Sequence, residues 1–142
     1  MQINPKIIYG DFHKDARGIV TFFNHFIMDS VKRMYIIEPS DKYDIRAWQG
    51  HRYERKWFYP LVGNFDVRLI KPLNWDNPNK VSETFKFTLE SNSNEILHIP
   101  GGFINGFRGL DSGAKLMVFS NLSLDDSKID DIRFPTELWN FE

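Results

Sequence analysis

The sequence predicts an all-β domain, and three observations favour this fold class. About ten short runs of β-branched and aromatic residues follow one another, separated by turn residues at regular spacing. No stretch has the apolar periodicity of a long helix. With 142 residues, of which 42% are hydrophobic and 15% aromatic, the chain can bury one core and is too apolar to be disordered.

The first expected strands lie in the N-terminal third. Residues 7–9 form a short apolar run, and residues 19–23 form a second run that is β-branched and aromatic. The turn between them, residues 15–18, ends in glycine. Residues 31–38 predict a further strand, which begins with two cations.

The remaining strands are expected in the rest of the chain. Residues 62–65, Val-Gly-Asn-Phe, place Gly-Asn between two apolar runs, and this pattern predicts a hairpin. Residues 83–89 alternate apolar and polar side chains, as in a strand with one buried face. Further strand-like runs are residues 65–70, 96–99, 103–110 and 114–121. A closed sandwich or a jelly-roll barrel hides the edges of so many strands.

Polar residues concentrate in one segment, residues 46–63. It contains one imidazole, His51, with four cations and five aromatic residues, namely Arg46, Arg52, Arg55, Lys56, Trp48, Tyr53, Trp57, Phe58 and Tyr59. Ordinary core strands carry few charges, because a buried charge needs a partner. The segment therefore predicts a pair of strands that line a polar, anionic ligand.

Charge and composition disfavour several other functions. The net charge of −1 gives no general attraction to nucleic acid or to acidic membranes, so we expect neither as a partner. The chain has no cysteine, which excludes disulfides and thiolate metal sites. It begins without the pattern of a signal peptide and has no apolar run of the roughly 20 residues that span a bilayer. We expect a cytoplasmic protein.

Several motifs resemble those of cupin-fold enzymes that act on nucleotide sugars. The segment 100–105, Pro-Gly-Gly-Phe-Ile-Asn, resembles the second cupin motif with Asn105 in place of histidine, and His51 with Glu54 resembles the first. Residues of five segments resemble motifs of the dTDP-4-dehydrorhamnose 3,5-epimerase family and follow the same order along the chain. These segments are 15–18, 50–51, 56–63, 65–67 and 100–107. The related dTDP-sugar 3,4-ketoisomerases are resembled by residues 31–36, 46–51 and 126–134.

The resemblance implies a single cupin-type jelly-roll (double-stranded β-helix) domain over residues 1–142, usually assembled as a homodimer. It also implies a nucleotide-linked 4-keto-hexose as substrate, no metal or organic cofactor, and a product used in bacterial surface polysaccharide. The reaction abstracts a proton beside the carbonyl and reprotonates the resulting enediolate, either as an epimerisation or as a ketoisomerisation. Both families place a catalytic histidine at His51, and the ordinary pKa of histidine suits a general base.

Two departures from these families leave the catalytic acid open. The epimerases carry a tyrosine acid on the strand that corresponds to residues 118–124, and this stretch contains no tyrosine. The ketoisomerases carry a second histidine where this chain has Tyr53. Tyr53 or Tyr35 is therefore the candidate acid. The departures also suit a rival, a non-catalytic module that binds a nucleotide sugar or glycan.

The resemblance and the neighbouring charges suggest further binding residues. We expect Arg46 and Lys56 to hold the diphosphate, Arg46 by its planar fork and Lys56 as a point charge. Trp48 is expected either to stack on the substrate or to lie in the core. Arg17 either reaches the site of a dimer partner or belongs to a plain turn, and Asn105 either lines the pocket or caps a turn.

The remaining ionisable residues are expected to have structural places. We expect His13 and His25 at the surface, and His98 as a hydrogen-bonded residue of the barrel wall. A metal-dependent cupin is a further alternative, with His51, Glu54 and His98 as its ligands, although such a site needs three or four ligands in place. Residues 130–131, both aspartates, are expected to face solvent, with a minor alternative in which one orients a histidine.

Overall fold

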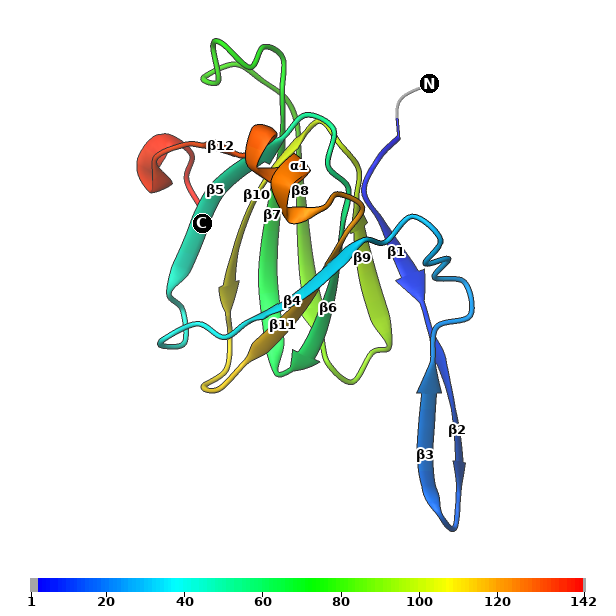
Figure 1. Ribbon diagram of the computed structural model, residues 1–142. Coiled ribbons are helices and arrows are strands. Elements are labelled where there is room, and N and C mark those ends of the chain that lie inside the picture. The colour runs from blue at the N-terminus through cyan, green and yellow to red at the C-terminus, as the bar shows by residue number, and fades with distance from the viewer. Residues whose placement is uncertain (1–2, 142) are drawn as a thin grey trace.

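Two five-stranded antiparallel sheets face each other in the computed structural model, which describes residues 3–141 (Figure 1). The first sheet has the strand order β1 (Lys6–Tyr9), β9 (Glu95–Ile99), β6 (Lys56–Val62), β11 (Lys115–Ser120) and β4 (Arg33–Ile37). The second has the order β12 (Ile132–Arg133), β5 (Ile45–His51), β10 (Phe103–Gly109), β7 (Asn64–Pro72) and β8 (Val81–Glu90). The all-β prediction is confirmed.

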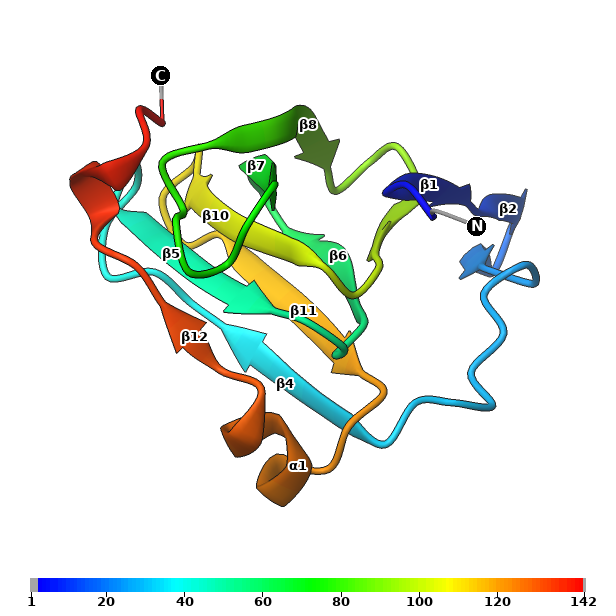
Figure 2. The same ribbon diagram turned by 90° about the horizontal axis from the view of Figure 1, so that it is seen from above.

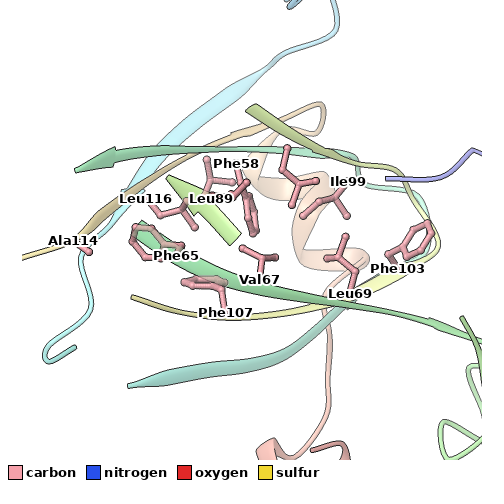
Figure 3. Close-up of a cluster of buried hydrophobic side chains, with 12 residues drawn as sticks. Phe58, Phe65, Val67, Leu69, Leu89, Ile99, Phe103, Phe107, Ala114 and Leu116 are labelled. Carbon is pink, nitrogen blue, oxygen red and sulfur yellow. The ribbon is translucent and has the colours of Figure 1, made fainter. Parts of the chain in front are cut away.

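The main hydrophobic core fills the space between the sheets (Figure 3). It follows from the alternation of side chains along each strand, because successive residues of a strand point to opposite faces. In β11, Leu116 and Val118 are fully buried in this core, whereas Met117 and Phe119 are only half-buried. Phe58 of β6 meets Phe107 of β10 across the sheets, edge to face, with ring centroids 5.7 Å apart.

A second, smaller cluster lies on the other face of the second sheet. In β7 and β10 the alternate residues Ile70 and Ile104 belong to it, and Trp48 of β5 joins them. Residues 134–141 cover this cluster, and the short 3-10 helix η1 (Thr136–Leu138) lies within that segment. The second sheet is therefore buried on both faces along its central strands.

The hairpin prediction for residues 62–65 is wrong. Strand β6 belongs to the first sheet and β7 to the second, so Gly63, with a φ of 72°, marks a corner where the chain changes sheet. Glycine relieves the steric cost of a positive φ in a corner as in a hairpin turn, so the local sequence does not distinguish the two. Strands β5 and β6 likewise belong to different sheets. The polar segment therefore gives one strand to each wall of the sandwich.

A two-stranded arm projects from the sandwich (Figure 1). It consists of β2 (Asp11–Asp15) and β3 (Gly18–Phe22), which, among the described strands, pair only with each other. The first of these strands was not expected, because its sequence is mostly polar. The apolar side chains Phe12, Ile19 and Val20 of the arm are all more than half exposed.

A short helix, α1 (Leu124–Ile129), and strand β12 lie beside β4 and β5, along one side of the sandwich (Figure 2). The helix begins where the Ser123 side chain accepts a hydrogen bond from the backbone N–H of Asp126, and two acidic residues in its first turn suit the helix dipole. Within residues 3–141, no helix has the length and apolar character needed to cross a membrane.

Candidate active site

A cavity of about 710 Å³ lies at the side of the sandwich that α1 and β12 flank. Tyr35 and Lys56 line it from the first sheet, and Arg46, Gln49 and Asn105 line it from the second. Both strands of the polar segment therefore contribute to one cavity, as the sequence predicted. Its volume is in the range of small-molecule sites.

The cavity wall is strongly cationic. Five of its residues carry a positive charge, namely Arg33, Arg46, Lys56, Lys128 and Arg133, and the only acidic side chain among the described residues of the wall is Asp131. Guanidinium groups bind phosphate oxygens through paired N–H donors. The wall therefore favours an anionic ligand, although the net charge of the whole chain is −1.

A lysine and a tyrosine meet in this cavity. The ammonium Nζ of Lys56 lies 3.0 Å from the hydroxyl oxygen of Tyr35 and 3.4 Å from Oε1 of Gln49. Lys56 is only 3% exposed, so its charge is only weakly screened by water. The pair offers two polar hydrogens to an oxygen that becomes negative during a reaction.

A further polar chain runs from this pair to the rim. Nε2 of Gln49 donates to Asp131 at 3.1 Å, and Nε of Arg133 donates to the same carboxylate at 2.7 Å. Burial opposes ionisation of Asp131, but the hydrogen bonds from Arg133 and Gln49 outweigh it and lower the pKa of this carboxyl group. Asp131 is therefore ionised and orients Gln49 towards Lys56.

His51 is buried at the end of β5, two residues beyond Gln49 on the same face of the strand. Its Nδ1 lies 2.8 Å from the backbone carbonyl oxygen of Asp130 and 3.3 Å from Oε1 of Glu54. A carbonyl oxygen only accepts, so Nδ1 carries the hydrogen and the lone pair lies on Nε2. No described residue forms a hydrogen bond with this Nε2.

The imidazole of His51 is held in its neutral form. Burial lowers the pKa of His51, and the positive charge of Lys56 lowers it further, while Glu54 and Asp130 act in the opposite direction. A neutral imidazole with a free lone pair is a general base. The histidine predicted as the base thus has the required protonation state.

Glu54 is a fully buried carboxylate next to this histidine. It accepts hydrogen bonds from the hydroxyls of Ser120 and Ser127, the latter at 2.8 Å, and from Arg33 at 3.2 Å. These donors compensate the burial of its charge. In the part of the chain that the structure describes, no group of three or more His, Cys, Asp or Glu side chains is placed to hold a metal ion.

Most of the predicted site residues line the cavity, and His51 lies next to them. Tyr35, Arg46, Lys56, Trp48 and Asn105 all line the cavity. His51 adjoins this group but is not itself part of the cavity wall, and it is 3% exposed.

Two of the wall residues are already engaged in the fold. Nδ2 of Asn105 donates to the carbonyl oxygen of Gln49 at 3.2 Å, which fixes its side chain in the wall. Trp48 is 2% exposed, packs against Trp139 and Phe141, and donates from Nε1 to the carbonyl of Thr136. Its core alternative therefore fits the packing better than stacking on a ligand.

Tyr53 and Arg17 lie away from this cavity. The backbone bends after β5, so Tyr53 leaves the strand face of His51; its side chain is 75% exposed and lines a separate hollow with Lys71 and Phe103. The expectation that Tyr53 is an acid of this site is thus not compatible with its position. Arg17 lies in the turn of the arm, where it pairs with Asp15 at 2.7 Å.

Two expectations for other ionisable residues are wrong. Asp130 is buried, at 7% exposure, although it was expected to face solvent. His98 is also buried, but neither ring nitrogen has a hydrogen-bond partner among the described residues. It stacks instead on Trp57, with ring centroids 5.1 Å apart.

Sequence reasoning missed several residues of the wall, namely Arg33, Gln49, Ser127, Lys128, Arg133 and Phe134. Arg33 was within reach, because it lies two residues before Tyr35 and strand alternation places both on one face. The residues of α1 and β12 gave no comparable signal, since neither element was expected.

Among known proteins, matches to this chain are found with solved structures. No protein-family model matches the sequence, and no curated protein does so either. Two matching structures are 3,4-ketoisomerases. A histidine-to-asparagine variant of QdtA from Thermoanaerobacterium thermosaccharolyticum is 23% identical with a TM-score of 0.74, over 94% of this chain and 90% of that one. A 3,4-ketoisomerase from Helicobacter canadensis is 20% identical with a TM-score of 0.75, over 96% of each chain.

A third match is a dTDP-4-dehydrorhamnose 3,5-epimerase from Bacillus anthracis, 17% identical with a TM-score of 0.74, over 94% of this chain and 79% of that one. The chain has the fold of the dTDP-sugar 3,4-ketoisomerases and 3,5-epimerases. The predicted cupin-type jelly roll is thereby confirmed. At these identities the likeness concerns the fold, so the chemistry rests on the site itself.

Proposed function

We propose that this chain isomerises or epimerises a nucleotide-linked 4-keto-hexose of the dTDP-sugar type. One observation carries the proposal: a buried, neutral His51 with a free lone pair adjoins a buried Lys56–Tyr35 pair at a cationic cavity. Proton abstraction beside a carbonyl needs a base, a donor to the oxyanion and binding for the diphosphate. We assign these three parts to His51, to the Lys56–Tyr35 pair and to the cationic wall.

In the proposed reaction, Nε2 of His51 takes the proton from the carbon next to the carbonyl. The electron pair of that C–H bond moves towards the carbonyl oxygen and forms an enediolate, whose negative oxygen is stabilised by the ammonium of Lys56. Tyr35 returns a proton to carbon, and its partner Lys56 stabilises the phenolate that forms. The carbon that receives the proton decides between epimerisation and ketoisomerisation.

The burial of Lys56 changes the role that the sequence suggested for it. Because its ammonium is buried and paired with Tyr35, we assign Lys56 to the reacting sugar and not to the diphosphate. We assign the diphosphate to Arg46, which is exposed and lines the cavity, with Arg133 beside it. Asn105 supports the wall between the two regions.

The structural neighbours agree with this substrate class. The QdtA variant was crystallised with TDP-4-keto-6-deoxyglucose, and the epimerase from Bacillus anthracis with TDP and pyrophosphate. Both ligands carry the diphosphate that a cationic wall would bind. For this chain the nucleotide and the sugar remain part of the proposal. So do a cytoplasmic location of the protein and the use of its product in surface polysaccharide.

We also propose that the chain forms a homodimer through the arm. A two-stranded hairpin is marginally stable by itself, and further strands or packing are needed to stabilise it. The exposed apolar residues of the arm suit contact with a second copy of the chain. In such a dimer Arg17, which is paired with Asp15 in the turn of the arm, would reach the cavity of the partner only by exchanging this contact.

The test is proton NMR in deuterated water with dTDP-4-keto-6-deoxyglucose. We expect loss of the signal of the C3 or C5 proton with the wild-type protein, and no loss with His51→Asn, which keeps the shape of the ring but removes the base. Both reactions remove the C3 proton. Exchange at C5 identifies epimerisation, whereas a carbonyl moved to C3 with deuterium at C4 identifies ketoisomerisation. Full exchange by a folded His51→Asn variant would remove His51 from the mechanism.

The position of His51 favours a second candidate, a non-catalytic module that binds a nucleotide sugar. His51 is not part of the cavity wall, and Tyr53 lies outside the site. The same NMR samples distinguish this candidate, since it predicts broadened ligand signals without exchange. Exchange at any carbon of the sugar excludes it.

A further inference from the structure

Asp130 makes an unusual set of contacts at the C-terminal end of α1. Its buried carboxylate accepts hydrogen bonds from three consecutive backbone N–H groups, those of Arg52 at 2.8 Å, Tyr53 at 2.8 Å and Glu54 at 2.7 Å. Successive N–H groups that point to one side form an anion site. Here the chain fills this site with its own carboxylate, and charge-assisted bonds of this kind are the strong ones.

The same residue contacts the ring of the base. The backbone carbonyl of Asp130 accepts the Nδ1–H of His51 at 2.8 Å, and it is separated from the carboxylate of Asp130 by only a few covalent bonds. The carboxylate therefore fixes the segment just after His51, and the carbonyl fixes the imidazole itself. Asp130 thus fixes both the imidazole of His51 and the backbone that follows it.

Other charged groups around His51 do not replace this contact. Glu54 approaches Nδ1 at 3.3 Å, but its carboxylate already accepts from Ser120, Ser127 and Arg33. Its backbone N–H is itself held by Asp130, so its position depends on the same clamp. Lys56 and Asp131 act on His51 through their charges alone.

We propose that Asp130 is a positioning residue, which holds His51 in the tautomer that has hydrogen on Nδ1 and the lone pair on Nε2. In the other tautomer a ring lone pair would face the carbonyl oxygen, which has no hydrogen to donate. The tautomer assignment depends only on the observed contacts. Its consequence for catalysis rests on the proposed function of His51 as the base.

The experiment compares Asp130→Asn with Asp125→Asn. Both exchange a carboxylate for an amide at α1, but the side chain of Asp125 is 95% exposed, and among the described residues its ion pair is with Lys128, at 4.0 Å. The amide of Asp130→Asn keeps one accepting oxygen and presents its own N–H hydrogens to the three backbone donors. Samples labelled with ¹⁵N at histidine give the tautomer of His51 from long-range ¹H–¹⁵N correlation spectra.

We expect the Nδ1–H form of His51 in the wild type and in Asp125→Asn, and a rise of the Nε2–H form in Asp130→Asn. An unchanged His51 spectrum in a folded Asp130→Asn variant would overturn the proposal. So would a wild-type spectrum that already shows the Nε2–H form, and this measurement keeps the proposal testable if the variant does not fold. His98, which lacks hydrogen-bond partners among the described residues, is the internal reference.

The exchange assay in deuterated water adds the catalytic readout. We expect Asp130→Asn to slow exchange by at least about 10-fold, and by no more than the roughly 10²–10⁴-fold that a positioned general base contributes. Asp125→Asn should exchange at the wild-type rate. If the wild type exchanges no proton, the proposed function fails, while the tautomer spectra still decide the role of Asp130.

Discussion

His51 and His98 are both buried, and the pKa of each lies below the ordinary value because burial disfavours the imidazolium ion. Their contacts differ. The Nδ1–H of His51 has an acceptor in Asp130, which leaves one defined nitrogen free for chemistry. His98 has no acceptor at either nitrogen among the described residues and lies against Trp57. The first arrangement suits a base, whereas the second is a liability for stability at low pH.

The liability of His98 gives a prediction for acid stability. Burial, followed by the charges of Arg55 and Lys6, lowers the pKa of His98 to about 4, whereas the unfolded chain has the ordinary value of 6.5. Between these values the unfolded state binds the extra proton, so stability falls as the pH drops from 6.5 towards 4. The loss amounts to about 3 kcal/mol at most. Urea unfolding at several pH values measures it.

The matched variants are His98→Phe, which keeps a ring against Trp57, and His13→Gln, which changes an exposed histidine. We expect the pH dependence to flatten in His98→Phe and to stay as in the wild type in His13→Gln. Equal slopes in all three proteins would show that folding does not lower the pKa of His98.

The two cations Lys56 and Arg46 give a second prediction at this scale. Lys56→Met removes the buried ammonium, and we expect exchange to slow by about 10²–10³-fold, the usual cost of losing an oxyanion donor. The Kd for dTDP should change little. Arg46→Ala should show the reverse, with a weaker Kd for dTDP and a nearly unchanged rate at saturating substrate.

Titration calorimetry with dTDP and the exchange assay provide the two measurements for each variant. Tyr35→Phe serves as the partner variant, because it removes the phenol but leaves the ammonium of Lys56 in place. A Lys56→Met protein that loses dTDP affinity and keeps its exchange rate would return Lys56 to the diphosphate site.

At the scale of elements, the arm is the part of the fold that lacks a partner. Strands β2 and β3 pair with each other alone, while every other strand belongs to a five-stranded sheet. Their exposed apolar side chains sit on both sides of the turn that contains Arg17. An element of this kind gains its packing from outside its own sheet.

The arm therefore gives a prediction for assembly. Val20→Asp places a charge on the exposed arm, and we expect a dimeric wild type to become monomeric, because burying an unpaired carboxylate is costly. Leu73→Asp is the control, since Leu73 is similarly exposed but lies after β7, away from the arm. Analytical ultracentrifugation gives the masses. A monomeric wild type would contradict the prediction, as would a dimeric Val20→Asp variant.

Elements also mark the boundary of what the sequence predicts. Most strands were found, because alternation and β-branched residues are local signals; residues 114–121, for example, contain β11. The connections were less accessible. Residues 62–65 have the composition of a hairpin turn, yet they carry the chain from one sheet to the other. Turn chemistry specifies a local φ, whereas the partner of a strand is decided by contacts distant in sequence.

For the whole molecule, the site also divides into parts that the sequence predicts and parts that it does not. The cationic and aromatic segment 46–63 predicted the region of the cavity, because charge in strand-like sequence is rare. The direction of Tyr53 was missed, since it depends on the bend after β5 and not on its spacing from His51. Asp130 was expected mainly at the surface, with orientation of a histidine as a minor alternative, because its three donors are backbone N–H groups, which leave no trace in the sequence.

The cavity wall is built from two kinds of segment. One side consists of barrel strands that also contribute residues to the main core. The other side comes from the continuous stretch 127–134. That stretch contributes two cations and Phe134 to the cavity, and none of its residues belongs to the main core. Within it, Ser127 and Asp130 are tied to Glu54 and His51, whereas the cations Lys128 and Arg133 face the cavity and can be substituted without repacking the main core. Ligand preference can thereby change through single cavity cations while the residues that fold the barrel stay constant.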